Sequence, residues 1–487
     1  MMNSLKQTVR ALFTLYGRHY PRVIVYMLQS TEYQVGPYLR WYWRTQDFSR
    51  VMYRRQLVET RAARWLRLAL ITGITLQLAC AVLLIVLWRT NGLVAGDLFG
   101  LALIVSYPVV WAHLITIPLL LGRELIAKPK ERALIEQSTR TFANHAGIRI
   151  AVAGSYGKTS MKELLLTVLS AGSKKVAATP ANKNVAISHA VFARKLDGDE
   201  DILIIEYGEG APGDVARFAR TTQPTHAIIT GLAPAHLDKY KTLDAAGKDI
   251  FSLAEYLGGK NAYVNAESPA IKPFLKPAYE TYGVNGALGW KAKNIKLTPT
   301  TTSFELTKGT RRLKLTSGLL GAHQVGPLSL AAALALEFGL TERQVTQGVA
   351  ATVPFEHRMQ PYQLSGAWII DDTYNGNIEG VRVGTELLAA LPAKRKLYIT
   401  PGLVEQGKET KAIHIRMGEL IATAKPDVVI LMANSAAPYI RHGLEQAHYD
   451  GEVRVEHEPL DFYTNLDQHV AAGDIVLMQN DWTDNYA

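Results

Sequence analysis

The clearest pattern along the chain is a pair of long apolar runs in its first quarter. Leu68–Trp88 holds 21 residues without a formal charge, and Leu98–Gly122 holds 25 more. A helix of about 20 apolar residues crosses the roughly 30 Å hydrocarbon core of a bilayer. The pattern therefore predicts a transmembrane helical hairpin at about 68–88 and 98–122. The alternative is a buried helical hairpin in a soluble domain.

Basic residues gather on the outer sides of both runs, whereas the connection Arg89–Asp97 carries one positive and one negative charge. The outer flanks contain Arg50, Arg54, Arg55, Arg61, Arg64, Arg67, Arg123, Lys128, Lys130 and Arg132. Lys and Arg near the ends of a span mark its cytoplasmic side. We therefore expect both flanks in the cytoplasm and the short connection outside. The first run begins too far along the chain for a cleaved signal peptide.

Residues 1–65 mix apolar, aromatic and basic positions. Residues 9–28 form an apolar stretch that contains three arginines, and Pro21 is expected to interrupt a helix there. Further on, the aromatic residues Tyr38, Trp41, Tyr42 and Trp43 alternate with Arg40 and Arg44. Cationic aromatic helices of this kind can lie in the lipid headgroup layer. A small cytoplasmic helical subdomain with solvated arginines fits equally well, so both interpretations stay open.

Beyond residue 147, short apolar segments alternate with amphipathic ones. Strands are predicted at 149–153, 201–206, 225–230 and 396–400, a helix at 161–170, and a β-hairpin at 301–317 that turns at Lys308-Gly309. Strands that alternate with helices are typical of α/β domains with a parallel sheet. A length of 487 residues allows about three domains.

Composition and charge narrow the classes of partner. Hydrophobic residues make up 48% of the chain and charged residues 20%, which excludes a mainly disordered protein. Of the net charge of +10, residues 1–67 contribute most, with 12 Lys and Arg against 3 Asp and Glu. This argues against a protein that coats nucleic acid, and predicts a local anionic partner such as the membrane lipid surface. The single Cys80 excludes an intrachain disulfide and a zinc site built from several cysteines.

A glycine loop between the strand at 149–153 and the helix at 161–170 is typical of phosphate binding. The loop consists of Gly154, Ser155, Tyr156, Gly157, Lys158, Thr159 and Ser160. Backbone N–H groups and the helix N-terminus would hold phosphates. Lys158 would neutralise phosphate oxygens, and the Thr159 hydroxyl would reach Mg²⁺.

Two further groups follow predicted strands. Glu206 ends the strand at 201–206, and His236 comes soon after the strand at 225–230. Ligands of open α/β sheets bind at the carboxyl ends of the strands. Both side chains are therefore expected where a phosphate-bound metal would lie.

Together these motifs resemble the Mur ligase family, most closely its D-alanyl-D-alanine-adding branch, over residues 147–480. The matching segments are 154–163 (GSYGKTSMKE), Asn182-Lys183-Asn184 after Thr179, Glu206-Tyr207-Gly208 with Gly213-Asp214, Ala235–Asp238, Gly321-Ala322-His323, His357-Arg358-Met359 and Asp371–Asn377 (DDTYNGN). The family consists of ATP-dependent enzymes that build the peptide of bacterial cell-wall precursors through an acyl phosphate.

The resemblance implies an α/β fold with a P-loop central ATP-binding domain at 131–355 and a Rossmann-like C-terminal domain at 356–487. The basic helical membrane region would occupy 1–130. ATP and Mg²⁺ are the implied cofactors. A membrane-anchored carboxylate–amine ligase is expected, at the inner membrane with its ligase domains in the cytoplasm.

The resemblance also assigns roles to individual residues. It implies Lys158 and Arg358 as catalytic residues, with Lys248 as the candidate for a carbamylated lysine found in many members. It implies Thr159, Glu206 and His236 as metal ligands. For the nucleotide, it implies the loop Gly154–Ser160 with Asn182, Asp372, Tyr374 and Asn375.

Departures from the family pattern concern substrate choice. The membrane region stands where relatives carry a UDP-sugar-binding domain. Gln324 and Pro327 replace the usual asparagines, Ile378 replaces a proline, and 479–482 replaces a substrate loop. A lipid-linked or peptide acceptor is therefore expected, with an amino acid or short peptide as the amine donor. A polymerising ligase similar to poly-γ-glutamate synthases and a catalytically impaired nucleotide-binding scaffold are the alternatives.

Overall fold

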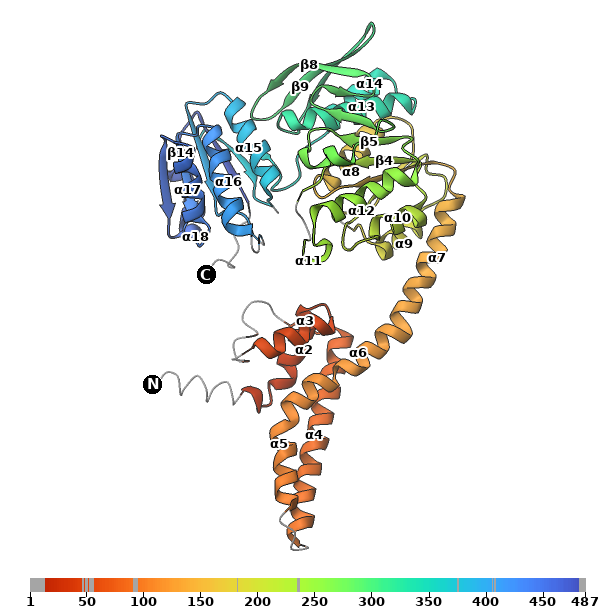
Figure 1. The fold of residues 1–487 in the computed structure, drawn as a ribbon, viewed down its shortest axis with the longest axis vertical. Helices are drawn as coiled ribbons and strands as arrows, with labels where there is room; N and C mark the ends of the chain where they lie inside the picture. The colour runs from red at the N-terminus through yellow and green to blue at the C-terminus, as the bar shows by residue number, and fades with distance from the viewer. Residues whose placement is uncertain are drawn as a thin grey trace. The chain divides into compact units, whose positions relative to one another are not determined.

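The computed structural model describes residues 14–45, 48, 51, 57–90, 95–181, 183–233, 237–374, 376–404, 406 and 409–480. The chain forms two compact units, Met1–Ala133 and Leu134–Ala487, and each is described here by itself. Figure 1 shows the elements of both units in chain order.

The first unit is helical. Its elements are α2 (Tyr20–Ser30), α3 (Val35–Arg44), α4 (Arg61–Thr90), α5 (Ala95–Leu114), α6 (Thr116–Gly122) and the π-helical turn η2 (Arg123–Ala127). Helix α7 (Lys128–Asn144) begins in this unit and ends in the second. Helices α4 and α5 lie side by side as an antiparallel pair (Figure 1), as the two apolar runs predict. By length and composition, the stretches Arg61–Thr90 and Gly96–Asn144 are apolar enough to cross a membrane.

Small and polar residues fix the contact between α4 and α5. The Trp111 ring of α5 packs so closely against Gly73 of α4 that any Cβ there would collide with it. The Trp111 indole Nε1 donates to Gln77 Oε1 at 2.7 Å, and Gln77 Nε2 donates to the Leu103 carbonyl at 2.9 Å. Gln77 is therefore satisfied inside the helix pair, and the register of the two helices is specific.

Helices α2 and α3 pack against this pair and share one hydrophobic core with it. The Tyr20 hydroxyl donates to the Pro108 carbonyl at 2.5 Å, and the Tyr38 hydroxyl donates to the Ala112 carbonyl at 2.9 Å. Pro21 lies in the first turn of α2 and does not interrupt it, because a residue without an N–H suits that position. Residues 14–45 thus belong to a packed helical subdomain, although α3 leaves Arg40, Trp43 and Arg44 exposed.

The second unit contains two sheets. The first is ten-stranded, in the order β10-β9-β8-β7-β6-β5-β4-β1-β3-β2. Its strands are β1 (Ile148–Ala153), β2 (Val176–Ala178), β3 (Ile202–Glu206), β4 (His226–Ile229), β5 (Ala262–Asn265), β6 (Glu280–Gly283), β7 (Gly286–Ala287), β8 (Trp290–Leu297), β9 (Thr302–Lys308) and β10 (Arg311–Ser317). Strands β2 to β6 pair in parallel around β1, and β6 to β10 continue as antiparallel neighbours.

Helices cover both faces of the parallel part. They are α8 (Lys158–Leu169), α9 (Ala186–Ala193), α10 (Asp214–Thr222), α11 (Leu237–Tyr240), α12 (Leu243–Tyr256), α13 (Val325–Glu337) and α14 (Glu342–Ala350), with short 3₁₀ turns at Pro269–Phe274 and Ala322–Gln324. Alternate residues of β1 enter different cores: Ile150 and Val152 join α8, α13 and α14, whereas Ala151 and Ala153 join α10 and α12. A strand buried on both faces gives the continuous apolar run seen in the sequence.

The second sheet has six strands in the order β11-β12-β16-β13-β14-β15. They are β11 (Gln360–Leu364), β12 (Ala367–Asp372), β13 (Arg395–Thr400), β14 (Val428–Met432), β15 (Glu452–Glu456) and β16 (Asp474–Gln479), with helices α15 (Ile378–Ala390), α16 (Thr410–Thr423), α17 (Ala437–Gln446) and α18 (Pro459–Thr464) and a 3₁₀ turn at Leu466–Gln468. All pairs except β11–β12 are parallel. This arrangement agrees with the expected Rossmann-like domain.

Candidate functional site

The glycine loop after β1 is held tightly against the end of β4. Gly154 and Gly157 have φ angles of +146° and +74°, which side-chain-bearing residues rarely adopt. A Cβ on Gly154 would also collide with the Thr230 hydroxyl. The Ser155 N–H donates to the Gly231 carbonyl at 2.9 Å, and the Thr230 hydroxyl donates to the Tyr156 carbonyl. Two glycines are thus required for this loop to turn from strand into helix.

Helix α8 begins directly at Lys158, three residues before the predicted start, because Lys158, Thr159 and Ser160 form its first turn. Its N-cap Gly157 supplies no side-chain cap, so the first N–H groups stay available to an anion. The Ser155 hydroxyl is buried without a hydrogen-bond partner. These unsatisfied donors fit the phosphate groups of a nucleotide.

Glu206 lies at the carboxyl end of β3, next to this first turn. Its Oε1 accepts hydrogen bonds from Thr159 Oγ1 and from Asn184 Nδ2, each at 3.1 Å. Its Oε2 is buried without a hydrogen-bond partner and lies 3.5 Å from Lys162 Nζ. The structure therefore brings Thr159 and Glu206 together, as predicted. Hydroxyl and carboxylate oxygens are ligands that Mg²⁺ prefers, so the pair fits that ion.

Lys162 is a component of the site that sequence reasoning missed. Its side chain is fully buried. The ammonium donates to the Thr179 carbonyl at 2.9 Å and to the Ala181 carbonyl, and it pairs with Glu163 at 3.1 Å. It therefore joins α8, the loop after β2 and the Glu206 carboxylate. Its spacing of four residues from Lys158 places both on one side of α8, and it lies within the family-like segment 154–163, but neither feature indicated its burial or its partners.

Lys158 has a partner that no motif indicated. Its Nζ lies 2.8 Å from Oε2 and 3.1 Å from Oε1 of Glu209, and it also donates to the Gly154 carbonyl. Glu209 is 5% exposed. The phosphate-loop lysine is thus paired with a buried carboxylate of the loop after β3.

His189 of α9 holds the backbone at the end of β3. Its Nε2 hydrogen-bonds the Glu206 carbonyl oxygen at 2.8 Å. Burial lowers the pKa of His189 to about 4, so the imidazole is neutral. A neutral ring that donates from Nε2 fixes the backbone at Glu206 without adding charge. Three other predicted residues, Asn182, His236 and Asn375, lie outside the described residues, and their roles stay predictions.

A cavity of about 400 Å³ lies beside the phosphate loop. Its walls include the predicted residues Tyr156, Gly157, Ser160, Arg358, Asp372 and Tyr374. The Arg358 guanidinium lies over the Tyr374 ring at 4.8 Å from its centroid, a cation–π contact that orients the charge. Residues far apart in the sequence thus line one cavity next to Lys158.

Asp372 is held in place at the wall of this cavity. Its Oδ1 accepts from the Met359 N–H at 3.2 Å, and its Oδ2 accepts from Gln479 Nε2 at 2.8 Å. Burial raises its pKa to about 6. Gln479 stands where relatives are expected to carry a substrate loop, and here it braces Asp372.

His323 and Gln324 also line the cavity. Their side chains approach at 2.9 Å, between Gln324 Nε2 and His323 Nε2. Burial lowers the pKa of His323 to about 4, and the charge of Arg382 adds to this effect. A glutamine therefore lies at the cavity wall where the family pattern has an asparagine.

Lys248 lies apart from these residues. Its side chain is exposed and pairs with Asp244 at 2.7 Å on the outer side of α12. The buried side of α12 carries Asp249, which accepts from the Gly213 N–H at 3.0 Å and from the Tyr240 hydroxyl at 2.7 Å. The catalytic role of Lys248 stays a prediction that its present contacts do not support.

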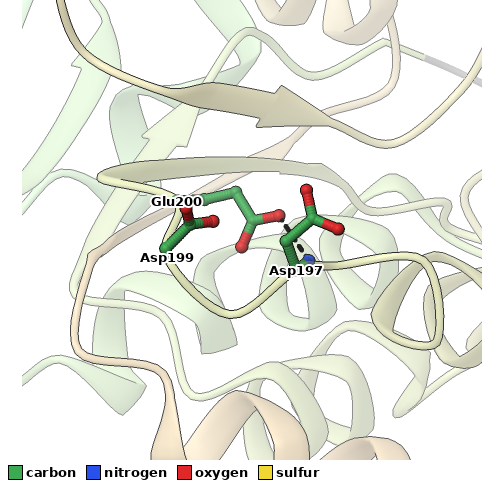
Figure 2. Close-up of side chains that lie close together, drawn as sticks. All are labelled: Asp197, Asp199 and Glu200. Carbon is green, nitrogen blue, oxygen red and sulfur yellow. Dashed lines mark hydrogen bonds between the residues drawn. The ribbon is translucent and has the colours of Figure 1, made fainter.

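An acidic group at 197–200 also invites comparison with a metal site (Figure 2). The Lys175 ammonium lies between Asp197, at 2.7 Å, and Asp199. Glu200 accepts from the N–H groups of Asp197 and Gly198 at 2.8 and 2.9 Å. A lysine already neutralises the exposed carboxylates and the buried one caps a turn, so the group is explained as a structural feature.

Residues 152–335 match the Mur ligase middle domain. The UDP-N-acetylmuramoyl-tripeptide–D-alanyl-D-alanine ligase of Escherichia coli is 28% identical over 314 residues, which cover 62% of this chain and 67% of that protein. The corresponding ligase of Bacillus subtilis is 24% identical and covers 71% of this chain and 76% of its own length.

Solved structures show the same fold. MurF from Acinetobacter baumannii superposes with a TM-score of 0.62 at 21% identity, over 72% of this chain and 77% of that chain. MurF from Thermotoga maritima, solved in complex with ADP, gives 0.62 at 22% identity, over 72% and 80%. These findings support the Mur ligase family and its MurF branch, whose members are ATP-dependent peptide ligases. The chain spans 67% of the length of the Escherichia coli ligase and 63% of that of the corresponding ligase of Mycobacterium tuberculosis.

Proposed function

We propose that the protein is a membrane-anchored, ATP-dependent carboxylate–amine ligase that forms an amide bond on a cell-wall precursor. The observation that carries the proposal is the convergence of Lys158, Thr159 and Glu206 beside a cavity lined by Arg358 and Asp372. Phosphoryl transfer depends on positioning and on neutralising charge, and it needs no protein nucleophile.

The reaction divides into two steps. A substrate carboxylate oxygen attacks the γ-phosphorus of ATP, which gives an acyl phosphate and ADP. The nitrogen of an amine then attacks the acyl carbon; the C–O bond to phosphate breaks, inorganic phosphate leaves, and the amine loses a proton. Lys158, the Ser155 hydroxyl and the first N–H groups of α8 would hold the phosphates, while Thr159 and Glu206, together with His236, would hold Mg²⁺. The ion would offset the negative charge of the phosphates.

The relatives suggest the class of substrate. Their names describe a UDP-N-acetylmuramoyl-tripeptide acceptor and D-alanyl-D-alanine as the amine. In this chain a helical unit with two long apolar helices precedes the Mur ligase middle domain. A membrane-held enzyme meets a membrane-held substrate at a raised effective concentration. We therefore propose a lipid-linked muropeptide as the acceptor and an amino acid or short peptide as the amine.

Anchoring is supported by the exposed apolar surface of the hairpin. Large apolar side chains of α4 and α5 such as Leu76, Val82, Leu98 and Phe99 are more than half exposed, which is unusual for helices in water. Arginines at the start of α4, together with the exposed Arg40 and Arg44, suit an anionic lipid surface. We propose the inner membrane as the location, with the ligase unit in the cytoplasm.

In the test, the purified full-length enzyme is incubated with matched UDP-linked and undecaprenyl-linked muropeptides. Each acceptor is combined with a panel of amines that includes D-alanyl-D-alanine. Amide formation is followed by mass spectrometry and ADP release by a coupled assay, with Lys158→Ala as the inactive control. We expect faster turnover of the lipid-linked form. Equal or faster turnover of the UDP-linked form would contradict the lipid-linked acceptor and leave the ligase activity standing.

A nucleotide-binding scaffold is the second candidate, and the surface position of Lys248 favours it. A scaffold would bind ADP and release none from ATP with any acceptor. A polymerising ligase would instead extend its own product, which a ladder of product masses would show.

A further inference from the structure

Glu209 is a buried charge that neither the motifs nor the proposed chemistry assigns. It lies three residues after Glu206, between Gly208 and Gly210, in the loop that follows β3. Its side chain is 4% exposed, and Lys158 is its ion-pair partner, at 2.8 Å. Surface ion pairs contribute little, but breaking a buried pair by removing one partner is strongly destabilising. The Lys158–Glu209 contact is therefore a substantial local interaction.

The same contact determines where the lysine points. Besides Glu209, the Lys158 ammonium donates to the carbonyl of Gly154, the first glycine of its own loop. The side chain is thus folded back over the loop whose phosphate it would neutralise. A Lys ammonium has three donors, and at least two of them are taken by the protein in this arrangement. A phosphate must compete with these groups for the lysine.

We infer that Glu209 acts as a latch, which holds Lys158 in a resting position and must release it when a nucleotide binds. The inference rests on the proposed function, since it takes the phosphate loop to be a nucleotide site. A protein that is only partly in its binding-competent arrangement has its apparent affinity reduced by that fraction. Glu209 therefore weakens nucleotide binding, both by holding the lysine and by placing a negative charge near the phosphates.

Two other roles for Glu209 would give different changes in nucleotide affinity. If Glu209 bound the Mg²⁺ that accompanies the nucleotide, its removal would weaken binding and raise the Mg²⁺ requirement. If it served only to stabilise the fold, its removal would lower the melting temperature without strengthening nucleotide binding. The sign of the affinity change thus separates a latch from these alternatives.

The experiment measures ADP binding to the full-length protein in detergent by calorimetry, with Mg²⁺ and with EDTA. Glu209→Gln removes the charge and keeps the shape. Glu255→Gln is the matched control, because it removes a carboxylate from an exposed pair with Lys276 away from the loop. We expect the Kd for ADP to fall by roughly fivefold or more in Glu209→Gln, the range of a typical coupling energy, with and without Mg²⁺. Glu255→Gln should match the wild type.

Glu209→Asp provides a second test should the amide variant fold poorly. The shorter side chain keeps the charge but reaches less far, so its Kd should fall between those of the wild type and Glu209→Gln. A Kd that is unchanged or raised in both variants would overturn the latch. Absence of ADP binding by the wild type would instead contradict the proposed function itself, so the two failures are distinguishable.

Discussion

In the proposed reaction, Lys158 is the residue on which phosphate neutralisation should depend most directly. One preorganised charge beside a transferring phosphoryl group contributes about 3–4 kcal/mol, or roughly 10²–10³ in rate. Lys158→Ala should therefore lower ATP turnover by about that factor. Lys276→Ala, which removes an exposed lysine far along the chain, should have no effect. Near-normal ADP release by Lys158→Ala would refute the phosphate-loop assignment.

Glu206 and His236 are predicted to act through Mg²⁺. Because Glu206 is buried and accepts from Thr159 Oγ1, its loss removes an anionic ligand at the phosphates. Glu206→Gln and His236→Ala should each raise the Mg²⁺ concentration for half-maximal activity, with smaller effects on melting temperature. Titrations of both variants that overlay the wild-type curve would exclude the metal-site interpretation.

Lys162 is expected to stabilise the site rather than to touch substrate. Replacing it with methionine leaves Glu206 buried without its cation and frees two loop carbonyls. Removing one partner of a buried pair costs about 3–5 kcal/mol. Thermal unfolding should therefore show a large drop in stability for Lys162→Met. Lys162→Arg, which keeps the charge, should recover part of it, whereas equal losses in both variants would point to packing alone.

At the scale of elements, the hairpin contact between α4 and α5 allows a matched comparison. The Trp111 ring fills the space beside Gly73, whereas a Cβ on Gly122 would meet nothing within 4 Å. Overpacking costs about 1–3 kcal/mol, while alanine in an open helical position stabilises by up to about 1 kcal/mol. Gly73→Ala should thus lower the melting temperature of the full-length protein in detergent, and Gly122→Ala should not. A neutral Gly73→Ala would show that the helices separate readily.

The strands that flank the site could be predicted to within two residues, because β1, β3 and β4 are short apolar runs in an otherwise polar context. The hairpin of β9 and β10 is found as predicted, but it turns at Gly309-Thr310, one residue beyond the predicted Lys308-Gly309, because Lys308 still pairs with Arg311. Gly309 has a φ of +59°. The start of α8 was wrong by three residues because Lys158, Thr159 and Ser160 are polar yet helical. Composition alone cannot separate loop from first turn in a phosphate-binding segment.

The candidate site was predictable only where a motif marked it. The structure brings the predicted Thr159 and Glu206 within hydrogen-bond distance, because one follows the glycine loop and the other ends β3. Their roles as metal ligands stay predictions. Lys162 and Glu209 were missed because a charged residue gives no sign of burial in the sequence. Their roles depend on partners 44 and 51 residues away along the chain, and such contacts are set by the way β3 pairs with β1.

At the scale of the whole molecule, the proposed membrane-anchored ligase requires one direction of insertion for the hairpin. The proposed reaction uses ATP, which is cytoplasmic, so the proposal requires the unit that contains the phosphate loop to lie on that side of the membrane. The arginines before α4 and the basic residues after α6 mark the same side. The sole ion pair described near the outer connection, Arg89 with Asp97 at 3.0 Å, nearly neutralises that end of the hairpin.

A reporter fused after Ala487 should therefore show a cytoplasmic location, and a reporter inserted near Asn91 should show an external one. Adding Lys residues around Asn91 and removing Arg61, Arg64 and Arg67 should reverse the insertion in a fraction of molecules, with a matching loss of activity in cells. An external reporter at Ala487 in the unaltered protein would contradict both the hairpin and the ATP-dependent ligase.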